Sequence, residues 1–255
     1  TYVKGYRLGE INNNSHGTTM KIIQYINASN VIVEFQDDYK YKVHCAYREF
    51  KNGKVKNPYD KTFYNVGYTG VGKYKVRKNN EFSIQYKYWQ SMLRRCYSEE
   101  YHKKQPTYVK CQVDAEWLNF QNFAKWVDEN FYEVEDERIE LDKDILLKGN
   151  KSYNKYNCVF VPQSINMLFT KNNIARGKYP IGITEHFDKL EVSCKNFNGK
   201  RIYLGLYEKY EVLKAFNTYK KYKENLIKEV ADLYKNKIPI VLYNAMKNYI
   251  VEIDD

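Results

Sequence analysis

One stretch, residues 141–166, constrains this chain more than any other. It reads LDKDILLKGNKSYNKYNCVFVPQSIN and begins with a short apolar-acidic strand, Leu141–Ile145. A polar loop rich in Gly, Asn, Lys and Tyr leads to a second strand, Cys158–Val161. Pro162 comes next, and proline suits the first turn of a helix. The segment therefore predicts strand, loop, strand and helix.

Four polar residues stand at fixed points of this segment: Asp142, Lys143, Asn157 and Asn166. Their order and spacing resemble the HNH nucleases, whose ββα-metal motif has Asp-His on the first strand, then Asn-Leu, then His or Asn on the helix. The resemblance implies that Asp142 and Asn166 hold one divalent metal and that Asn157 braces the loop. Carboxylate and amide oxygens suit Mg²⁺ or Mn²⁺. The metal would neutralise charge that develops on a scissile phosphate.

The departure from that motif is Lys143, which stands where the family has its general-base His. A lysine with a pKa of about 10.4 is protonated at neutral pH and cannot accept a proton. A nearby metal and burial would both lower that pKa. Lys143 is thus an unusual base, a phosphate clamp, or the mark of a site that has lost its chemistry, with Asp144 and His102 as weaker substitutes. An ordinary β-hairpin with polar loop residues is the alternative to a site of any kind.

The net charge of +11 is distributed unevenly along the chain. Residues 1–80 carry 14 Lys and Arg against 6 Asp and Glu, residues 81–170 carry 12 against 14, and residues 171–255 carry 16 against 11. Two basic flanks thus enclose a slightly acidic middle that contains the candidate site. A polyanion held by the flanks and presented to the middle would suit this pattern. General solubility is the alternative explanation.

Cysteine usage and hydropathy argue against a structural zinc site and against a membrane-spanning protein. The five cysteines are scattered and include no CxxC pair, so the structural zinc of many HNH proteins is not expected. Reduced thiols favour a cytoplasmic location, and the resemblance implies that the cell is bacterial or phage-infected. No apolar run reaches the ~18 residues needed to cross a bilayer, and no signal peptide is evident. The sequence therefore predicts no membrane partner.

Residues 1–76 are predicted to form a basic, β-rich N-terminal module. Apolar residues at intervals predict a small barrel or meander, with strands at residues 20–26, 31–35 and 40–43. The module either binds nucleic acid or is a basic scaffold without specific contacts. The glycine-rich run Gly67–Lys73 faintly resembles a phosphate loop. It lacks the full glycine spacing and a Ser or Thr after Lys73, which favours a hairpin or linker.

Residues 77–170 are predicted to be the ββα-metal core with its supporting helices. Helical spacing begins around Trp89, and Asp114 is placed to cap a further helix with an apolar face extending to Val127. Arg94 and Arg95 stand upstream of the candidate site and are expected to bind the phosphate. A solvated helix end is the other interpretation of these two arginines.

A basic linker is predicted at residues 171–178, followed by a C-terminal block that begins at residue 179. Strands Ile181–Thr184, Lys189–Lys195 and Lys200–Leu204 form a three-stranded sheet. A helix from about Tyr210 covers its apolar face. The open face is basic and polar, as in sheets that enter the major groove of DNA.

This block resembles the Apetala-type (ethylene-response-factor-like) DNA-binding domain, which also accompanies HNH modules in phage homing endonucleases. The matching features are Gly182, the Asn198-Gly199-Lys200 turn, the Leu204-Gly205 step and the aromatic-containing helix. The resemblance implies that five residues touch DNA: Lys189, Ser193, Lys195, Arg201 and Tyr203. A small α+β unit with a solvated charged face is the alternative.

Taken together, the sequence predicts an α+β phage or mobile-element protein of the HNH homing-endonuclease type, with domains at 1–76, 77–170 and 179–255. It would bind double-stranded DNA and, if active, nick it with one Mg²⁺ or Mn²⁺. Its rival is a DNA-binding regulator or inhibitor of host defence that has lost the chemistry. A third possibility is an RNA- or protein-directed binder that uses the 27 tyrosines. The C-terminal helices could also form a homodimer contact.

Overall fold

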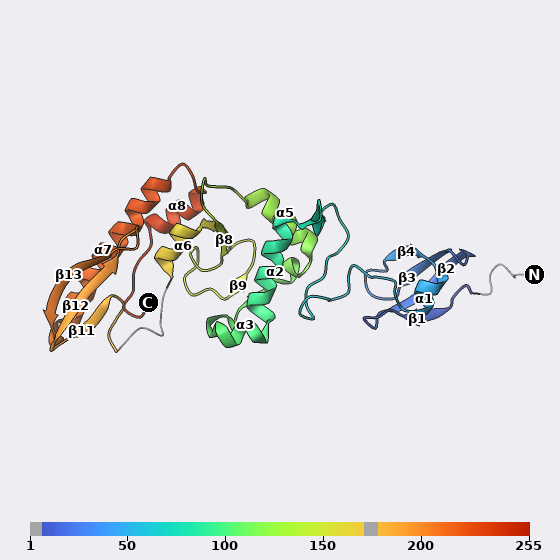
Figure 1. Ribbon diagram of the computed structural model, residues 1–255, viewed down its shortest axis with the longest axis horizontal. Coiled ribbons are helices and arrows are strands. Elements are labelled where there is room, and N and C mark those ends of the chain that lie inside the picture. Colours follow the sequence, from blue (N-terminus) through green and yellow to red (C-terminus); the bar gives the residue numbers. More distant parts are fainter. Residues whose placement is uncertain (1–6, 171–177) are drawn as a thin grey trace, which may run out of the picture. The chain divides into compact units, whose positions relative to one another are not determined.

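The computed structural model describes residues 7–170 and 178–255, which form a mixed α+β protein with several small sheets (Figure 1). The chain divides into two compact units, residues 1–129 and 130–255. Most of the linker predicted at residues 171–178 lies outside the described residues.

The first unit begins with a four-stranded antiparallel sheet whose strands pair in chain order. The strands and the helix after them are β1 (Ile11–Asn13), β2 (Thr19–Asn27), β3 (Asn30–Phe35), β4 (Lys42–Cys45) and α1 (Tyr47–Lys51). Alternate apolar residues of β2 and β3 are fully buried with Phe50 of α1, so one face of the sheet forms a core. The last strand begins at Lys42, because Lys40 has φ +48° and belongs to the preceding turn.

Helices make up most of the regular structure in the rest of the first unit. Its elements are β5 (Arg77–Lys78), β6 (Glu81–Phe82), α2 (Ile84–Tyr97), α3 (Glu99–Lys104), the 3₁₀ turn η1 (Pro106–Tyr108), β7 (Gln112–Val113), α4 (Ala115–Leu118) and α5 (Phe120–Asn130). Trp89 is buried, and its indole N–H donates to the Trp117 carbonyl at 2.8 Å. Trp117 in turn packs against Trp126 with ring centroids 4.7 Å apart. The aromatic spacing read from the sequence therefore belongs to a core.

The helix predicted from Asp114 to Val127 is in fact two helices. Asp114 does cap the first, since its Oδ1 accepts the Glu116 N–H at 2.9 Å. Asn119 then takes an extended conformation and accepts the Gln121 N–H at 3.0 Å. A second capping residue inside the apolar pattern thus ends α4 and starts α5.

The second unit begins with three short strands, of which the first and third pair, and a helix. The elements are β8 (Ile139–Asp142), β9 (Ser152–Tyr153), β10 (Val159–Pro162) and α6 (Gln163–Phe169), and β8 pairs with β10 so that Asp142 faces Val159. Val159, Val161, Ile165 and Leu168 join a core with the last turns of the long helix α7 (Val212–Tyr234). The predicted order of strand, loop, strand and helix is present. The first strand begins two residues earlier than predicted and ends at Asp142.

The second unit continues with a three-stranded antiparallel sheet, in the order β11 (Ile183–His186), β12 (Lys189–Lys195) and β13 (Arg201–Glu208). After a 3₁₀ turn, η2 (Lys209–Glu211), α7 lies along one face of this sheet (Figure 1). Leu190 and Val192 of β12 are fully buried under Phe216 and Tyr219 of α7. The helix α8 (Ile240–Lys247) then packs on α7. The predicted sheet and covering helix are therefore both found.

Candidate functional site

The strand β8 presents two carboxylates on one face. Ile139 and Leu141 are buried, while Glu140 and Asp142 alternate with them and lie on the other face. Asn166 of α6 reaches this second face, because its Nδ2 donates to Glu140 Oε2 at 2.5 Å. The structure therefore brings Asn166 to the face of β8 that carries Asp142. The residue on that face to which Asn166 bonds directly is Glu140, two residues before Asp142.

Asp142 is held by the chain that follows it. Its Oδ1 accepts the N–H groups of Asp144 at 2.8 Å and Ile145 at 2.7 Å, which turns the backbone out of the strand. That capping explains why β8 ends at Asp142. Burial, and then the nearby charge of Asp144, raise the pKa of the Asp142 carboxyl to about 6. Its second oxygen, Oδ2, accepts no hydrogen bond from a described residue.

Lys143 follows the last residue of β8 and is buried, with 7% of its surface exposed. Its Nζ donates to Asp144 Oδ2 at 3.0 Å and to the Asn150 carbonyl at 3.1 Å. The ammonium is thus engaged in an ion pair and a hydrogen bond within the loop. Its role as a base or clamp stays a prediction. Asp144, a predicted substitute base, is the carboxylate of this ion pair.

The loop between the strands is braced by two asparagines that the sequence interpretation did not single out. Asn150 donates through Nδ2 to the carbonyls of Lys143 at 2.6 Å and Ser152 at 2.7 Å. Asn154 Oδ1 accepts the N–H of Asn157 at 3.0 Å. The predicted brace, Asn157, contributes this backbone N–H, and its side chain makes no hydrogen bond to a described residue. Its role as a brace of the loop stays a prediction.

The donor set on this face suits a hard divalent cation. Asp142 keeps one carboxylate oxygen without a protein partner among the described residues, and Asn166 uses only its NH₂ group on Glu140. One carboxylate and one amide oxygen leave most of a cation's coordination to water, as Mg²⁺ prefers. Within the described residues no three His, Cys, Asp or Glu side chains are grouped to hold a metal. A set of one Asp and one Asn falls below that number.

The remaining predicted residues of the nuclease site belong to the other unit. Arg94 and Arg95 lie at the end of α2, over the rings of Tyr101 at 5.0 Å and Tyr108 at 6.0 Å. His102 of α3 has a ring nitrogen 2.9 Å from the Arg95 carbonyl oxygen. The arginines are therefore supported by aromatic rings. Whether they share a phosphate with Asp142 stays a prediction.

The open face of the β11–β13 sheet carries all five residues predicted to touch DNA. Arg201 and Lys195 pair across β13 and β12, and Tyr203 pairs with Ser193. Tyr203 is 61% exposed. The strand register therefore places these side chains on neighbouring positions of one surface.

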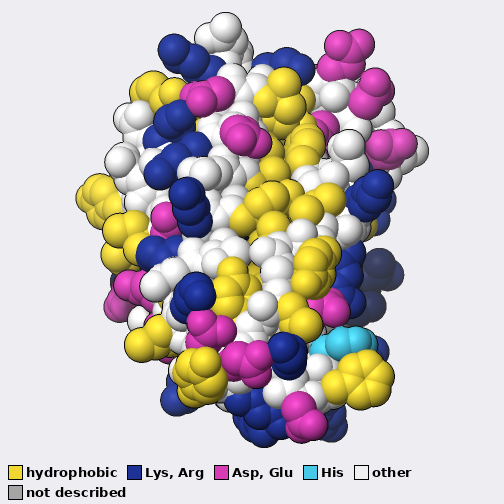
Figure 2. Space-filling view, turned by 90° about the vertical axis from the view of Figure 1, so that its left-hand side faces the viewer, with side chains coloured by type: hydrophobic (Ala, Val, Ile, Leu, Met, Phe, Trp, Pro, Cys, Tyr) yellow, Lys and Arg dark blue, Asp and Glu magenta, His cyan; other side chains and the backbone are white. Residues whose placement is uncertain are grey.

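That face is less basic than its lysines and arginines indicated. The Arg201 guanidinium donates to Glu191 at 2.6 Å and to Ser193 Oγ at 2.9 Å. Lys189 pairs with Glu208 at 2.7 Å. Positive and negative side chains are also intermixed around a hydrophobic band on the side of the molecule where this sheet lies (Figure 2). Binding a phosphate here would require these cations to exchange partners.

Glu140 is the residue of this site that could have been found in the sequence. It precedes Asp142 by two positions, and side chains two apart share a face of a strand. The predicted strand began at Leu141, which left Glu140 outside it. The pairing of Asn166 with Glu140 depends on how α6 folds back over the strands, and no local pattern reports that.

Comparison with protein families, with curated proteins and with solved structures finds no match to this chain. None of the helices in residues 7–170 and 178–255 combines the length and apolar character needed to cross a bilayer.

Proposed function

We propose that this chain is a double-stranded-DNA-binding protein of the HNH homing-endonuclease type. The observation that carries the proposal is the ββα arrangement of β8, β10 and α6, in which Asn166 of the helix bonds to Glu140 on the strand face that also carries Asp142. The same constellation was expected from the order of the polar residues. Two independent features, residue spacing and chain topology, thus support one interpretation.

In this proposal Asp142 and Asn166 hold one Mg²⁺ or Mn²⁺, which supplies charge neutralisation at a phosphate and at the leaving oxygen. Glu140 positions Asn166 by accepting its NH₂ group, which directs the amide oxygen away from Glu140. Asn150 and Asn154 hold the loop that carries the Lys143 ammonium. One metal per chain favours nicking of one strand.

The β11–β13 sheet is the proposed DNA-reading surface. Its open face presents the cations, a serine hydroxyl and an exposed tyrosine from two adjacent strands. A rigid sheet backed by α7 can enter a major groove, where arginine and lysine contact base edges and phosphates. The phage or mobile-element setting follows from the family resemblance alone.

A second candidate function is favoured by the state of Lys143. Its ammonium is buried and paired with Asp144, so in this arrangement it cannot accept a proton from water. A protein with this site would bind DNA without cutting it, as a regulator or an inhibitor of host defence. The two candidates share the DNA-binding surface and differ in hydrolysis.

Incubation of supercoiled plasmid with the full chain and Mn²⁺ separates the candidates. Nicking by the wild type, lost in Asp142→Asn, is the result expected of the endonuclease. Asn at this position retains an oxygen for the two backbone N–H groups, so the variant tests the metal ligand rather than the fold. Salt-sensitive binding of duplex DNA without nicking supports the regulator. Duplex RNA is tested beside duplex DNA at matched salt. If the chain does not bind duplex DNA, both candidates are wrong.

A further inference from the structure

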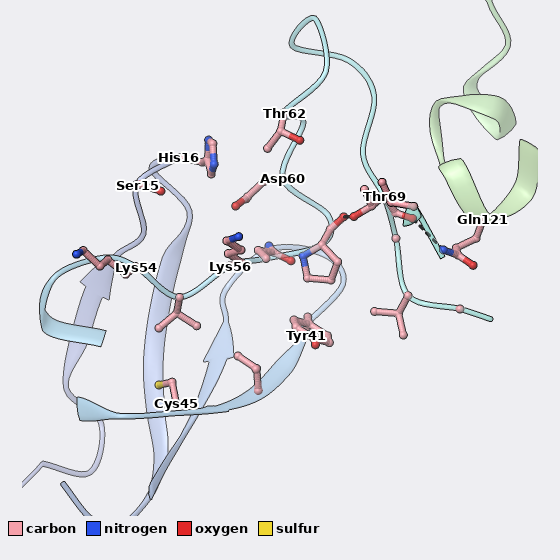
Figure 3. A pocket seen from close by; sticks show the side chains of 18 of the residues that line it. Ser15, His16, Tyr41, Cys45, Lys54, Lys56, Asp60, Thr62, Thr69 and Gln121 are labelled. Carbon is pink, nitrogen blue, oxygen red and sulfur yellow. Dashed lines mark hydrogen bonds between the residues drawn. The ribbon is translucent and has the colours of Figure 1, made fainter. Parts of the chain in front are cut away.

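The first unit contains a cavity that none of the proposed functions uses. Its volume is about 1190 Å³, and it lies between the β1–β4 sheet, the chain that follows α1, and the start of α5 (Figure 3). Pockets for small molecules are usually ~300–1,000 Å³. The size and open form of this cavity suit a segment of a polymer. We call it the groove.

Three lysines line the groove without an acidic partner. Lys54, Lys56 and Lys75 are exposed, and none of them makes an ion pair with a residue in the part of the chain that the structure describes. This contrasts with Lys189 and Arg201 on the β11–β13 sheet, which are both paired. Unpaired ammonium groups are available for phosphates without an exchange of partners.

The two carboxylates that line the groove are already engaged. Asp60 is buried and accepts hydrogen bonds from Asn14 Nδ2 at 2.7 Å and Thr18 Oγ1 at 2.5 Å. Glu49 accepts the Ala46 N–H at 3.0 Å and so caps α1. The charge of Asp60 is thus buried in the fold, and the exposed Glu49 uses one of its oxygens in the α1 cap, whereas the three lysine side chains are exposed and have no such partner among the described residues.

Aromatic rings also line the groove, and other rings hold two of them, Tyr41 and Phe63, in place. Tyr41, Phe63 and Tyr74 are each partly exposed there. Phe63 packs edge-on against Trp89 at 4.9 Å, and Tyr41 stacks on Phe35 at 6.3 Å. Rings that are already immobile lose little entropy when a base stacks on them.

The far wall of the groove is fixed by Gln121 of α5. Its Nε2 donates to the carbonyls of Thr69 at 3.3 Å and Tyr74 at 3.1 Å, and its Oε1 accepts the Tyr74 N–H at 3.0 Å. Gly72 lies so close that a Cβ there would stand 2.3 Å from Gln121 Oε1. The glycine-rich run Gly67–Lys73 therefore serves close packing, and it sets one wall of the groove.

We propose that the groove is a binding site for single-stranded nucleic acid. Lys54, Lys56 and Lys75 neutralise successive phosphates, and the rings of Tyr41, Phe63 and Tyr74 are platforms for bases. Cations that follow a backbone, combined with rings that stack on bases, are what sequence-tolerant single-strand binding needs. A double helix presents its bases stacked inside and offers nothing to those rings. The site is separate from the β8–β10–α6 unit and does not depend on its chemistry.

The test is filter binding of the full chain to an oligothymidylate of about 20 nucleotides, longer than the ~4–16 that single-strand folds cover. The triple variant Lys54→Ala/Lys56→Ala/Lys75→Ala is expected to bind at least about tenfold more weakly at low salt, and to lower the salt slope by about 2. The matched control, Lys87→Ala/Lys103→Ala/Lys110→Ala, removes three exposed lysines of the same unit that do not line the groove. The affinity of this control for the oligothymidylate should fall by less than about threefold.

A second pair of variants isolates stacking. Tyr74→Ala should weaken binding several-fold with no change of salt slope, and Tyr74→Phe should bind like the wild type. An oligouridylate of equal length shows whether the groove distinguishes RNA from DNA. The proposal is overturned if the triple variant binds like the wild type, if the control loses as much, or if duplex DNA depends equally on the three lysines. Circular dichroism of each variant verifies that it is folded.

Discussion

Two residues at the end of β8 decide what the candidate metal site can do. Asp142 is buried beside Asp144 and has a pKa raised to about 6. Lys143, the next residue, is also buried, and its ammonium donates to Asp144 and to the Asn150 carbonyl. The site thus combines a carboxylate that resists ionisation with a cation that cannot serve as a base while paired.

We expect Lys143→His to raise metal-dependent nicking if the loss of the family's His is all that disarms the site. A neutral imidazole can accept a proton near pH 7, whereas a paired ammonium cannot. The measurement is the rate of plasmid nicking in Mn²⁺, with Asp142→Asn/Lys143→His as the control. An unchanged or lower rate would mean that Lys143 is itself the working group.

The raised pKa of Asp142 predicts a pH-dependent effect of Asp142→Asn on stability, measured with chelator present. In the folded wild type the carboxyl stays protonated to higher pH than its ordinary 3.8, so the stability it contributes is complete below about 4 and is lost as pH rises through about 6. The neutral amide does not titrate. Between pH ~4 and ~6 the free energy of unfolding of the variant should therefore rise by about 1–3 kcal/mol relative to that of the wild type. Urea unfolding that shows the same difference at acid and neutral pH contradicts the assignment.

At the scale of elements, packing decides positions that residue patterns leave open. The alternation of β12 and the capping by Asp114 were predictable, because strand period and helix caps are local. The end of β8 was not, since it follows from two hydrogen bonds that Asp142 makes only once the chain turns. The pairing of Asn166 with Glu140, 26 residues away, needed the folded helix.

Gly182 is predicted to be among the least replaceable residues of the C-terminal sheet. It has φ +81°, and a Cβ there would lie 2.0 Å from the Tyr219 ring of α7. Gly182→Ala should cost at least ~2–3 kcal/mol, because it adds overpacking to backbone strain. Gly199→Ala is the matched control, since Gly199 has φ +78° and open space around it. Its cost should be only about 1–2 kcal/mol by urea unfolding, and equal losses would contradict the packing explanation.

Because Arg201 and Glu191 form an ion pair, we expect replacement of each to have the opposite effect on duplex DNA binding. Arg201→Ala should weaken duplex DNA binding about tenfold, through the loss of a phosphate or base contact. Glu191→Gln should strengthen it several-fold, because it removes a competing carboxylate 2.6 Å from the guanidinium. Gel shifts at one salt concentration measure both variants. If both weaken binding alike, the pair supports the sheet and does not read DNA.

At the scale of the whole molecule, the two units carry different proposed partners. The groove belongs to residues 1–129 and the β11–β13 sheet to residues 130–255. The net charge of the chain is distributed in a similar way, because the basic segments lie toward both ends of the sequence.

One molecule should therefore bind a single strand and a duplex at the same time. The dissociation constant of the labelled oligothymidylate should change less than about twofold when unlabelled duplex is present at saturation, since counterion release at one site leaves the other intact. The triple lysine variant should lose only the single strand. Displacement of the oligothymidylate by duplex would place both on one surface.

The buried tryptophans give the first unit an optical label that the second lacks. All three tryptophans of the chain, Trp89, Trp117 and Trp126, belong to residues 1–129. Selective excitation of indole therefore reports on the first unit alone, because the tyrosines of both units do not absorb at that wavelength. Red-shifted emission that precedes the loss of helical signal during a melt would reveal two cooperative halves, with no need to cut the chain.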